Sequence, residues 1–502
     1  MAGLVREIVA SYYFGESKAA SAFTIASQIP NLMSNLFAQA ALSAAFVPVF
    51  TDLLQQGRKK EAFRLASTLF WIILIVLGAL TAIGILLAGL VLPHFSGKNF
   101  DGSIAATLTQ IMFPVVLLLG LTGMLVGILQ SYDEFTVAAL APVVWNLVIL
   151  GLLIGLHDQF SRGHAIYAYA IAWLAATVVQ MLLIASALRR IDFRLRFEID
   201  WHDPRIRQVF TLMLPVTIGL GIVNLDALIN STFGALVTKQ GPRAIQVAFL
   251  IYMLPQGIFS VAVSTVLFPT LSRQAARRAP AEMRRTLGTG MRQITLLLVP
   301  AAAGMLLLAE PLTRLLFQHG DFNATDTRLT AEALRWFAVS LPFGGLNLLL
   351  TRTFFALQRP WIPTKLAAIN MVVDIILSVG LYKPLGLAGL VIGTAVANMV
   401  MTWLQIRRLR IGFNGHLEGR QTLMITLRIA VASVFTGAIA RGVWALLNSA
   451  VGTSVVGQVI SVGVAVAVAG TFYAMATLAM RIPEARQIEM LVRGRLVGLL
   501  AS

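Results

Sequence analysis

The sequence predicts an all-α integral membrane protein with about fourteen transmembrane helices. Hydrophobic residues make up 58% of its 502 residues and charged residues only 12%, against roughly 25% charged residues in soluble domains. The mean hydropathy is +0.81. Apolar runs of about 20 residues, each long enough to cross a bilayer core of about 30 Å, recur from end to end. Because no long polar stretch remains for a soluble domain, the whole chain is expected to be one membrane unit.

The apolar runs form two sets of six helices and a final pair. The first set is expected at 1–14, 20–53, 63–92, 104–130, 137–156 and 164–188, and the second at 208–237, 244–272, 286–309, 328–357, 362–382 and 386–407. The final pair is expected at 422–447 and 455–480, followed by a basic amphipathic tail on the membrane surface. We therefore predict an N-terminal lobe at 1–200, a C-terminal lobe at 201–410, and two extra helices with the tail at 411–502. The first run covers only about 21 Å, so part of that helix is expected to be missing.

The basic residues predict the orientation in the membrane. With the N-terminus in the cytoplasm, the inner loops carry 26 Lys and Arg residues and the outer loops 8, as the positive-inside rule requires. Both termini are therefore expected in the cytoplasm. The net charge of +17 is explained by these loops, so we do not expect a nucleic-acid partner. The absence of cysteine excludes disulfides and thiolate metal sites.

An internal repeat predicts that the two six-helix lobes are pseudo-symmetric. The segment from Ser43 to Pro48 is echoed 221 residues later by the segment from Ser264 to Pro269, and the same offset pairs Arg64 with Arg285. A weaker echo pairs Leu129-Gln130 with Leu357-Gln358. Such halves usually enclose a central site that opens alternately to each side of the membrane. The alternative is chance similarity between amphipathic helix ends.

Several segments between residue 3 and about residue 410 resemble the MurJ (MviN) family. The resemblance is carried by Arg6-Glu7, Phe14-Gly15, Ile29-Pro30-Asn31-Leu32, Leu36-Phe37-Ala38, Phe46-Val47-Pro48, Phe113-Pro114, Gly127-Ile128-Leu129, Ala141-Pro142, Asn146, Leu267-Phe268-Pro269, the run from Leu315 to Phe322, Phe354-Phe355-Ala356-Leu357 and Pro363-Thr364-Lys365. The run from Arg314 to Phe322 and Pro30-Asn31 are the most specific. The last two helices match only as apolar spans.

The resemblance implies a fold and a function. The fold is that of the multidrug/oligosaccharidyl-lipid/polysaccharide exporter superfamily. The function is flipping of lipid II, the undecaprenyl-diphosphate-linked glycopeptide precursor of peptidoglycan, across the bacterial cytoplasmic membrane. The resemblance implies a transporter and not an enzyme, with membrane lipids as further partners. In the family the last two helices are thought to form a groove for the polyprenyl tail.

The chain also departs from the family pattern. The family commonly has basic residues after the Pro-Asn pair, where this chain has Ser34 and Asn35. It often has an Arg and an acid shortly before the proline at position 255, where this chain has Leu250 and Met253. The family commonly has an acidic residue after the first loop, where this chain has Ser21, and another in the second helix, where this chain has Gln39. Several groups expected to grip a diphosphate are thus absent. A flippase for another polyprenyl-diphosphate-linked oligosaccharide, a cation-coupled drug exporter and a degenerate scaffold protein stay open as alternatives.

Five residues are candidate substrate ligands. Arg6 lies within the first helix, where a charge costs roughly 2.5–3.5 kcal/mol, and its guanidinium suits a phosphate oxygen. The alternative is that Arg6 forms a structural ion pair with Glu7 or with another helix. Because adjacent residues point about 100° apart on a helix, we expect Arg6 and Glu7 to face different ways. Asn31 follows a helix-kinking proline and bridges the freed backbone or contacts a sugar, while Ser34 and Asn35 continue its polar stripe. Arg352 binds substrate or serves a structural role.

Four residues are candidates for a cation or proton site. Asn370 and Asp374 are four apart and share one helix face, Asp226 lies in the middle of helix 208–237, and Thr394 lies in helix 386–407. Two carboxylates, an amide and a hydroxyl make a hard-oxygen set that suits Na⁺, and carboxylates can instead carry protons. The arrangement resembles a sodium site in some members of the family. The alternative is that each residue separately holds helices together.

Overall fold

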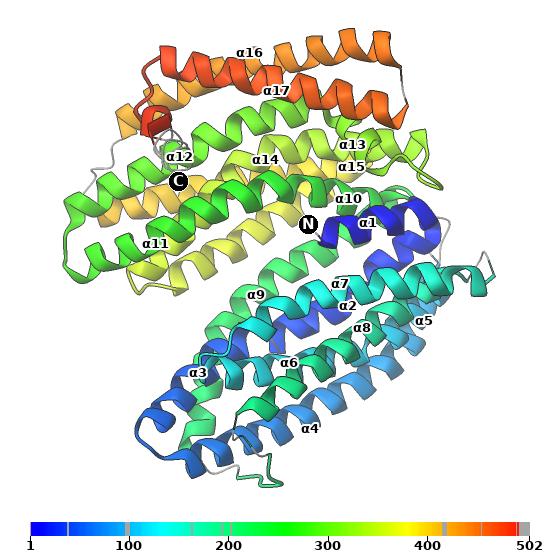
Figure 1. Ribbon diagram of the computed structural model, residues 1–502, viewed down its shortest axis with the longest axis vertical. Coiled ribbons are helices and arrows are strands. Elements are labelled where there is room, and N and C mark those ends of the chain that lie inside the picture. The colour runs from blue at the N-terminus through cyan, green and yellow to red at the C-terminus, as the bar shows by residue number, and fades with distance from the viewer. Residues whose placement is uncertain are drawn as a thin grey trace, which may run out of the picture. The chain divides into compact units, whose positions relative to one another are not determined.

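The structure is a computed structural model that describes residues 2–37, 40–95, 101–161, 164–191, 193, 195–200, 203–413, 419–452, 454–487 and 489–490. Every regular element in this part of the chain is helical, as predicted (Figure 1). The first nine α-helices are α1 (Ala2–Phe14), α2 (Lys18–Phe37), α3 (Ala40–Gln55), α4 (Lys59–Val91), α5 (Gly102–Met112), α6 (Pro114–Gln130), α7 (Thr136–Leu156), α8 (Ile166–Ala187) and α9 (Pro204–Val237). The others are α10 (Gly241–Pro255), α11 (Val261–Ala276), α12 (Pro280–Leu307), α13 (Ala309–Phe317), α14 (Ala324–Ala356), α15 (Trp361–Gly412), α16 (Gly419–Val451) and α17 (Val455–Ala479).

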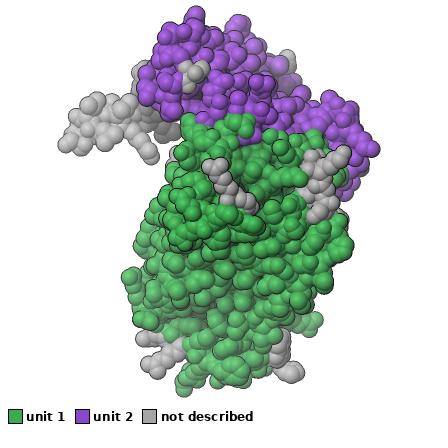
Figure 2. Space-filling model, turned by 90° about the vertical axis from the view of Figure 1, so that its right-hand side faces the viewer, with its two compact units in different colours: residues 1–243, 319–323 green, residues 244–318, 324–502 purple. Residues whose placement is uncertain are grey.

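The chain packs into two compact units, which Figure 2 shows in different colours. Unit 1 comprises Met1–Arg243 with His319–Asn323, and unit 2 comprises Ala244–Gln318 with Ala324–Ser502. Helix α9 belongs to unit 1, where it packs on α2 and α3. The boundary between the units falls inside α10, after Arg243. The predicted three-part division at residues 200 and 410 and the pseudo-symmetric lobes stay predictions.

Unit 1 has two apolar cores. One joins Phe46 and Phe50 of α3 to Leu69 of α4 and Met124 of α6. The other joins Phe14 of α1 to Phe23 of α2 and to Tyr169 and Trp173 of α8. Aromatic stacking tightens the second core, since the ring centroids of Phe23 and Tyr169 are 4.4 Å apart. This core fixes α1 against α8 and so sets the position of the charged residues of α1.

In unit 2, the regular helices are interrupted at two places. Between α10 and α11 the chain forms a π-helical turn, Gln256–Ser260, directly after Pro255. Helix α15 is bent at Gly386, whose φ of 59° and ψ of −135° are not helical. Helices α16 and α17 pack on each other, and α16 packs along α12 (Figure 1). Beyond α17 the chain buries Ile482 against Leu296, Ile425 and Ile429.

Ten helical segments in the described residues are long and apolar enough to cross a membrane. They are Lys59–His94, Gly102–Gln130, Thr136–Gln159, Ile166–Arg190, Gly241–Ala276, Pro280–Leu307, Ala324–Ala356, Trp361–Gly412, Gln421–Val451 and Val455–Ala479. The 52-residue segment Trp361–Gly412 covers both of the helices predicted at 362–382 and 386–407, and its bend lies between them. The count of fourteen crossings stays a prediction, while a multi-pass helical protein is what these segments show.

The structure also corrects some helix boundaries. The single helix predicted at 104–130 is interrupted at Phe113, because Pro114 at the first position of α6 has no N–H for the preceding helix. Helix α13 forms where an outer loop was expected. The helix predicted at 20–53 corresponds to α2 and α3, and α12 begins six residues before the predicted start at 286. Most other helix ends lie within a few residues of the predicted ones.

Backbone turns repeat at the offset found in the sequence. After α3, Gly57 has a φ of 72° and the Arg58 N–H donates to Leu53 O; after α11, Arg278 has a φ of 53° and the Ala279 N–H donates to Gln274 O. Both are helix-ending turns of the Schellman type, and they lie 221 residues apart. The same turn follows α6 at Asp133 and α14 at Gln358, which are 225 residues apart. The weaker echo is therefore wrong by three residues, since Leu129 corresponds to Phe354 and not to Leu357.

Candidate functional site

A buried carboxylate in α1 gathers three polar side chains in unit 1. The Glu7 side chain accepts hydrogen bonds from Arg6 Nη2 at 2.7 Å, Arg243 Nη1 at 2.8 Å and the Tyr169 hydroxyl at 3.1 Å. Arg243 also donates to the Ser11 hydroxyl, at 3.0 Å. Glu7 and Arg243 are only 5% and 2% exposed. Within unit 1 these contacts hold Glu7 to Arg243 and to Tyr169 of α8, and the desolvation of the buried ions is repaid only by such close pairing.

Arg6 lies next to two tryptophan rings that contact each other edge to face. Its guanidinium carbon lies 5.0 Å from the ring centroid of Trp145 and 5.2 Å from that of Trp173, within the range of cation–π attraction. The expectation that Arg6 and Glu7 face different ways is wrong, because both long side chains bend toward each other from adjacent positions. Arg6 Nε has no hydrogen-bond acceptor within the described part of the chain, so the side chain has a donor left for a ligand.

The predicted polar stripe of α2 is described only in part. Asn31 is half-buried and follows Pro30 inside the helix. The side chains of Ser34 and Asn35 lie outside the described residues. Two residues before the proline, the polar side chain of Gln28 donates to the Ser231 hydroxyl of α9. The stripe therefore faces α9 at Gln28, and the roles of Asn31, Ser34 and Asn35 in binding stay predictions.

A second buried carboxylate lies in α15 of unit 2. Asp374 is 1% exposed and accepts hydrogen bonds from the Thr394 and Ser378 hydroxyls, each at 3.3 Å. Thr394 also donates to Leu390 O at 3.4 Å. A Cβ at Gly393 would lie 2.9 Å from both Asp374 Oδ1 and Ser378 Oγ, so glycine permits this close approach. The structure thus brings Asp374 and Thr394 together, as predicted.

The other two predicted ligands of this cluster differ in placement. Asn370 lies one helical turn before Asp374, and its Oδ1 is buried without a hydrogen-bond donor among the described residues. Asp226 is half-buried in α9 and belongs to unit 1, so its membership of the cluster stays a prediction. Where the structure describes the chain, no group of three or more His, Cys, Asp and Glu side chains could hold a metal ion. The α15 cluster instead offers one carboxylate with amide and hydroxyl oxygens, a set suited to Na⁺ or to a proton.

Arg352 contacts a neighbouring helix. Its Nη1 donates to the Thr265 hydroxyl of α11 at 2.9 Å, and the side chain is half-buried in α14. This contact is of the structural kind that the sequence left open for Arg352. It leaves the substrate role untested.

The sequence did not single out Arg243, Tyr169, the two tryptophans or Ser378. Arg243 is one of the eight basic residues that the sequence places in outer loops, but its side chain is buried on Glu7. No local pattern links positions 7, 169 and 243, because their contacts are set by tertiary packing. Ser378 did carry a signal, since it lies four residues after Asp374 and therefore on the same helix face.

Comparison with protein families gives one match across nearly the whole chain. The family model described as "Lipid II flippase MurJ" matches residues 10–488. A protein of Rhizobium meliloti (strain 1021), named probable lipid II flippase MurJ, is 30% identical over 448 residues, which cover 87% of this chain and 82% of the relative. The lipid II flippase MurJ of Burkholderia cenocepacia is 29% identical over 420 residues, covering 81% of this chain and 80% of the relative.

Solved structures show the same fold at lower identity. A lipid II flippase MurJ in an inward closed conformation aligns with a TM-score of 0.80 at 20% identity, covering 96% of this chain and 97% of that one. An inward-facing multidrug resistance transporter of the MATE family and MOP superfamily aligns with a TM-score of 0.70 at 17% identity, covering 82% and 94%. At these identities the likeness concerns the fold alone.

Proposed function

The chain belongs to the lipid II flippase MurJ family, a family of transporters and not of enzymes, and from this premise we propose that it moves a polyprenyl-diphosphate-linked peptidoglycan precursor from the inner to the outer leaflet. The observation that carries the proposal is the family match over residues 10–488. The multi-pass helical architecture and the family place the chain in the bacterial inner membrane. Transport proceeds by alternating access, with both termini in the cytoplasm.

In this proposal Arg6 binds a phosphate oxygen of the substrate. The guanidinium is fixed by Glu7 and by the two tryptophan rings, so little side-chain entropy is lost when a ligand binds. Its unpartnered Nε supplies a donor, and hydrogen bonds between charged groups are roughly twice as strong as neutral ones. These features support a role for Arg6 as a substrate ligand in addition to its structural ion pair with Glu7.

Arg243 supports the same proposal by supplying positive charge where family basic residues are missing. The family often has an arginine at the position of Leu250. Arg243 lies seven residues, or two helical turns, before Leu250 and therefore on the same face of the helix. Its guanidinium contacts the same carboxylate as Arg6. Positive charge lost from the middle of α10 is thus regained at its start, beside the proposed phosphate ligand.

The membrane potential gives the transport a direction. With the cytoplasm negative, each negative charge moved outward gains about 2.3 kcal/mol per 100 mV. A diphosphate-linked lipid therefore moves downhill in the proposed direction. An inward-moving Na⁺ or proton bound at Asp374 is driven by the same potential and helps to reset the carrier, because it stabilises one of the two access states over the other.

The cation proposal is supported by the oxygens around Asp374. The hydroxyls of Thr394 and Ser378 lie on the carboxylate, and the Asn370 carbonyl oxygen is buried one turn away. A Na⁺ ion would be held by these oxygens, and a proton would sit on the Asp374 carboxylate. Transport that is insensitive to sodium and pH, together with an Asp374→Asn variant of normal activity, would overturn cation coupling without affecting the flippase assignment.

The alternative cargo is another polyprenyl-diphosphate-linked oligosaccharide. Just after the Pro-Asn pair of α2, Ser34 and Asn35 replace the basic residues common in the family. This replacement favours a cargo with a different head group. A cation-coupled drug exporter is a weaker alternative, supported by the fold likeness to the multidrug transporter. Both alternatives keep the carrier fold and change only the cargo.

Rescue of flippase-depleted cells tests the proposal directly. We expect the chain to restore growth and to restore lipid II at the outer face, measured by its accessibility to an externally added enzyme or probe. Arg6→Ala should abolish both while the protein accumulates in the membrane at its normal level. Growth without any lipid II at the outer face would sink the lipid II assignment and favour another head group.

A further inference from the structure

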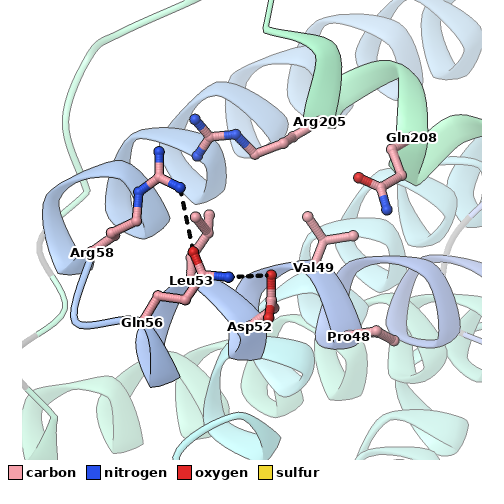
Figure 3. Close-up of a pocket in the computed structure, with 8 residues that line it drawn as sticks. All are labelled: Pro48, Val49, Asp52, Leu53, Gln56, Arg58, Arg205 and Gln208. Carbon is pink, nitrogen blue, oxygen red and sulfur yellow. Dashed lines mark hydrogen bonds between the residues drawn. The ribbon is translucent and has the colours of Figure 1, made fainter.

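A polar pocket of about 350 Å³ lies in unit 1, where the end of α3 meets the beginnings of α4 and α9 (Figure 3). Its volume is in the range of small-ligand sites, roughly 300–1,000 Å³. It is lined by Pro48, Val49, Asp52, Leu53, Gln56, Arg58, Arg205 and Gln208. It lies beside Arg58-Lys59-Lys60, which the loop charges predict to be at the cytoplasmic membrane surface.

Two guanidinium groups form one side of the pocket. Arg58 Nη2 and Arg205 Nη2 both donate to Glu61 Oε2 at 2.6 Å, and Arg58 Nε donates to Glu61 Oε1 at 2.8 Å. The hydrogen bonds from Arg58 to Glu61 raise the pKa of the Arg58 guanidinium above its ordinary value. Arg205 Nε lies 3.2 Å from Asp203 Oδ1. The shared carboxylate therefore holds two positive groups next to each other.

One donor of this pair has no acceptor. Arg205 Nη1 is buried, and no hydrogen-bond acceptor lies on it within the described residues. A buried donor without a partner is unfavourable, and an anionic ligand oxygen in the pocket would satisfy it. Phosphate oxygens match the planar guanidinium fork in geometry and charge.

The α3 side of the pocket carries a negative charge. Gln56 Nε2 donates to Asp52 Oδ2 at 2.8 Å, and Gln56 Oε1 accepts from Arg58 Nη1 at 3.3 Å (Figure 3). The two guanidiniums of Arg58 and Arg205 are thus accompanied by the carboxylates of Glu61, Asp203 and Asp52, so these groups carry no net positive charge. A simple anion would meet these carboxylates as well as two guanidiniums, so the pocket suits a ligand that carries both signs of charge.

We propose that this pocket binds the head group of a phospholipid with a primary ammonium group, of the phosphoethanolamine type. The phosphate lies against Arg58 and Arg205, and the ammonium lies against Asp52. Val49 and Leu53 offer apolar surface to the glycerol carbons. The bound lipid is a resident of the membrane and not cargo, so the inference is independent of the transported head group.

Lipid binding by the purified full-length chain tests this proposal. The detergent-solubilised protein is incubated with phosphatidylethanolamine, phosphatidylcholine or phosphatidylglycerol at equal concentration, and retained lipid is counted by native mass spectrometry. We expect phosphatidylethanolamine to be retained preferentially. Asp52→Asn should remove that preference with about a tenfold loss of affinity, the effect of one charge-assisted contact. Arg205→Gln should weaken the retention of all three lipids alike, since each of them carries the phosphate.

Arg64→Gln is the matched control. Arg64 belongs to the same basic stretch and pairs with Asp200 at 3.2 Å, but it does not line the pocket, so retention should not change. Equal retention of all three lipids, or a preference that survives Asp52→Asn, overturns the proposal. A competition with free phosphoethanolamine at the same concentration shows whether the pocket binds the lipid or only the free head-group compound. Displacement of the lipid by the free compound at equal concentration overturns the lipid assignment, and failure to displace it supports the lipid.

Discussion

Two buried carboxylates, one in each unit, have different surroundings. Glu7 in unit 1 lies between the guanidiniums of Arg6 and Arg243. Asp374 in unit 2 receives the hydroxyls of Thr394 and Ser378. Guanidiniums keep their charge at any physiological pH, so Glu7 takes part in a fixed ionic contact. Hydroxyls are neutral dipoles that can equally face a cation.

The difference assigns the two sites to different tasks. A cluster with two guanidiniums is suited to hold a phosphorylated head group next to a rigid support. A carboxylate lined by hydroxyl and amide oxygens is suited to bind and release Na⁺ or a proton. A carrier that couples an anionic lipid to a cation needs one site of each kind. The four predictions below test whether the first site is structural and the second exchangeable.

The largest effect is expected when Glu7 is neutralised. Glu7→Gln removes the carboxylate on which Arg6, Arg243 and Tyr169 converge, and breaking a buried ion pair costs roughly 3–5 kcal/mol. The melting temperature of the purified protein should fall strongly. Asp374→Asn is the matched change in unit 2 and should lower it much less, because its hydroxyl partners can also bond an amide. Equal losses for the two variants would break the comparison.

A smaller loss is expected from the hydroxyl of Tyr169. Tyr169→Phe keeps the stacking on Phe23 but deletes the 3.1 Å hydrogen bond to Glu7. Hydrogen bonds to charged groups contribute about 1.5–3 kcal/mol. The melting temperature should drop by less than in Glu7→Gln, and the double variant should be no less stable than Glu7→Gln alone. An additive loss in the double variant would show that Tyr169 acts independently of Glu7.

These contacts show how far the sequence alone could reach. Hydropathy predicted the helical class and most helix ends, because crossing a bilayer requires long apolar runs whatever the tertiary packing. Helical spacing placed Asn370 and Asp374 on one face of one helix, and the structure brings Thr394 to them. The partnership of Glu7 with Arg243 could not be predicted, since the two residues of unit 1 are 236 positions apart in the chain and meet only through tertiary packing. Because the sequence gives no sign of this contact, Arg243 was predicted to be a basic residue of an outer loop.

Filling the space beside Asp374 should affect unit 2 in a different way. In Gly393→Ala the new methyl lies 2.9 Å from Asp374 Oδ1 and Ser378 Oγ, and overpacking of this kind costs about 1–3 kcal/mol. Sodium- or pH-dependent transport should be lost more completely than stability. Gly380→Ala is the control on the same helix, because nothing lies within 4 Å of its added Cβ. A Gly393→Ala variant with unchanged cation dependence would mean that Asp374 is structural, like Glu7.

The smallest effect on stability is expected from Ser378. Ser378→Ala deletes one 3.3 Å hydrogen bond to Asp374 and leaves Thr394 in place, so the loss should be about 0.5–1.5 kcal/mol. Its effect on the apparent affinity for the coupling cation should nevertheless be clear, because one of the few oxygens around the carboxylate is gone. Transport measured against sodium concentration and pH in proteoliposomes separates the two quantities.

A shift in sodium affinity alone identifies Na⁺ as the coupling ion, whereas a shift in the pH profile alone identifies the proton. If neither shifts while stability falls, Ser378 serves only to hold α15 together, and the hydroxyl-lined site loses the feature that distinguishes it from the Glu7 cluster.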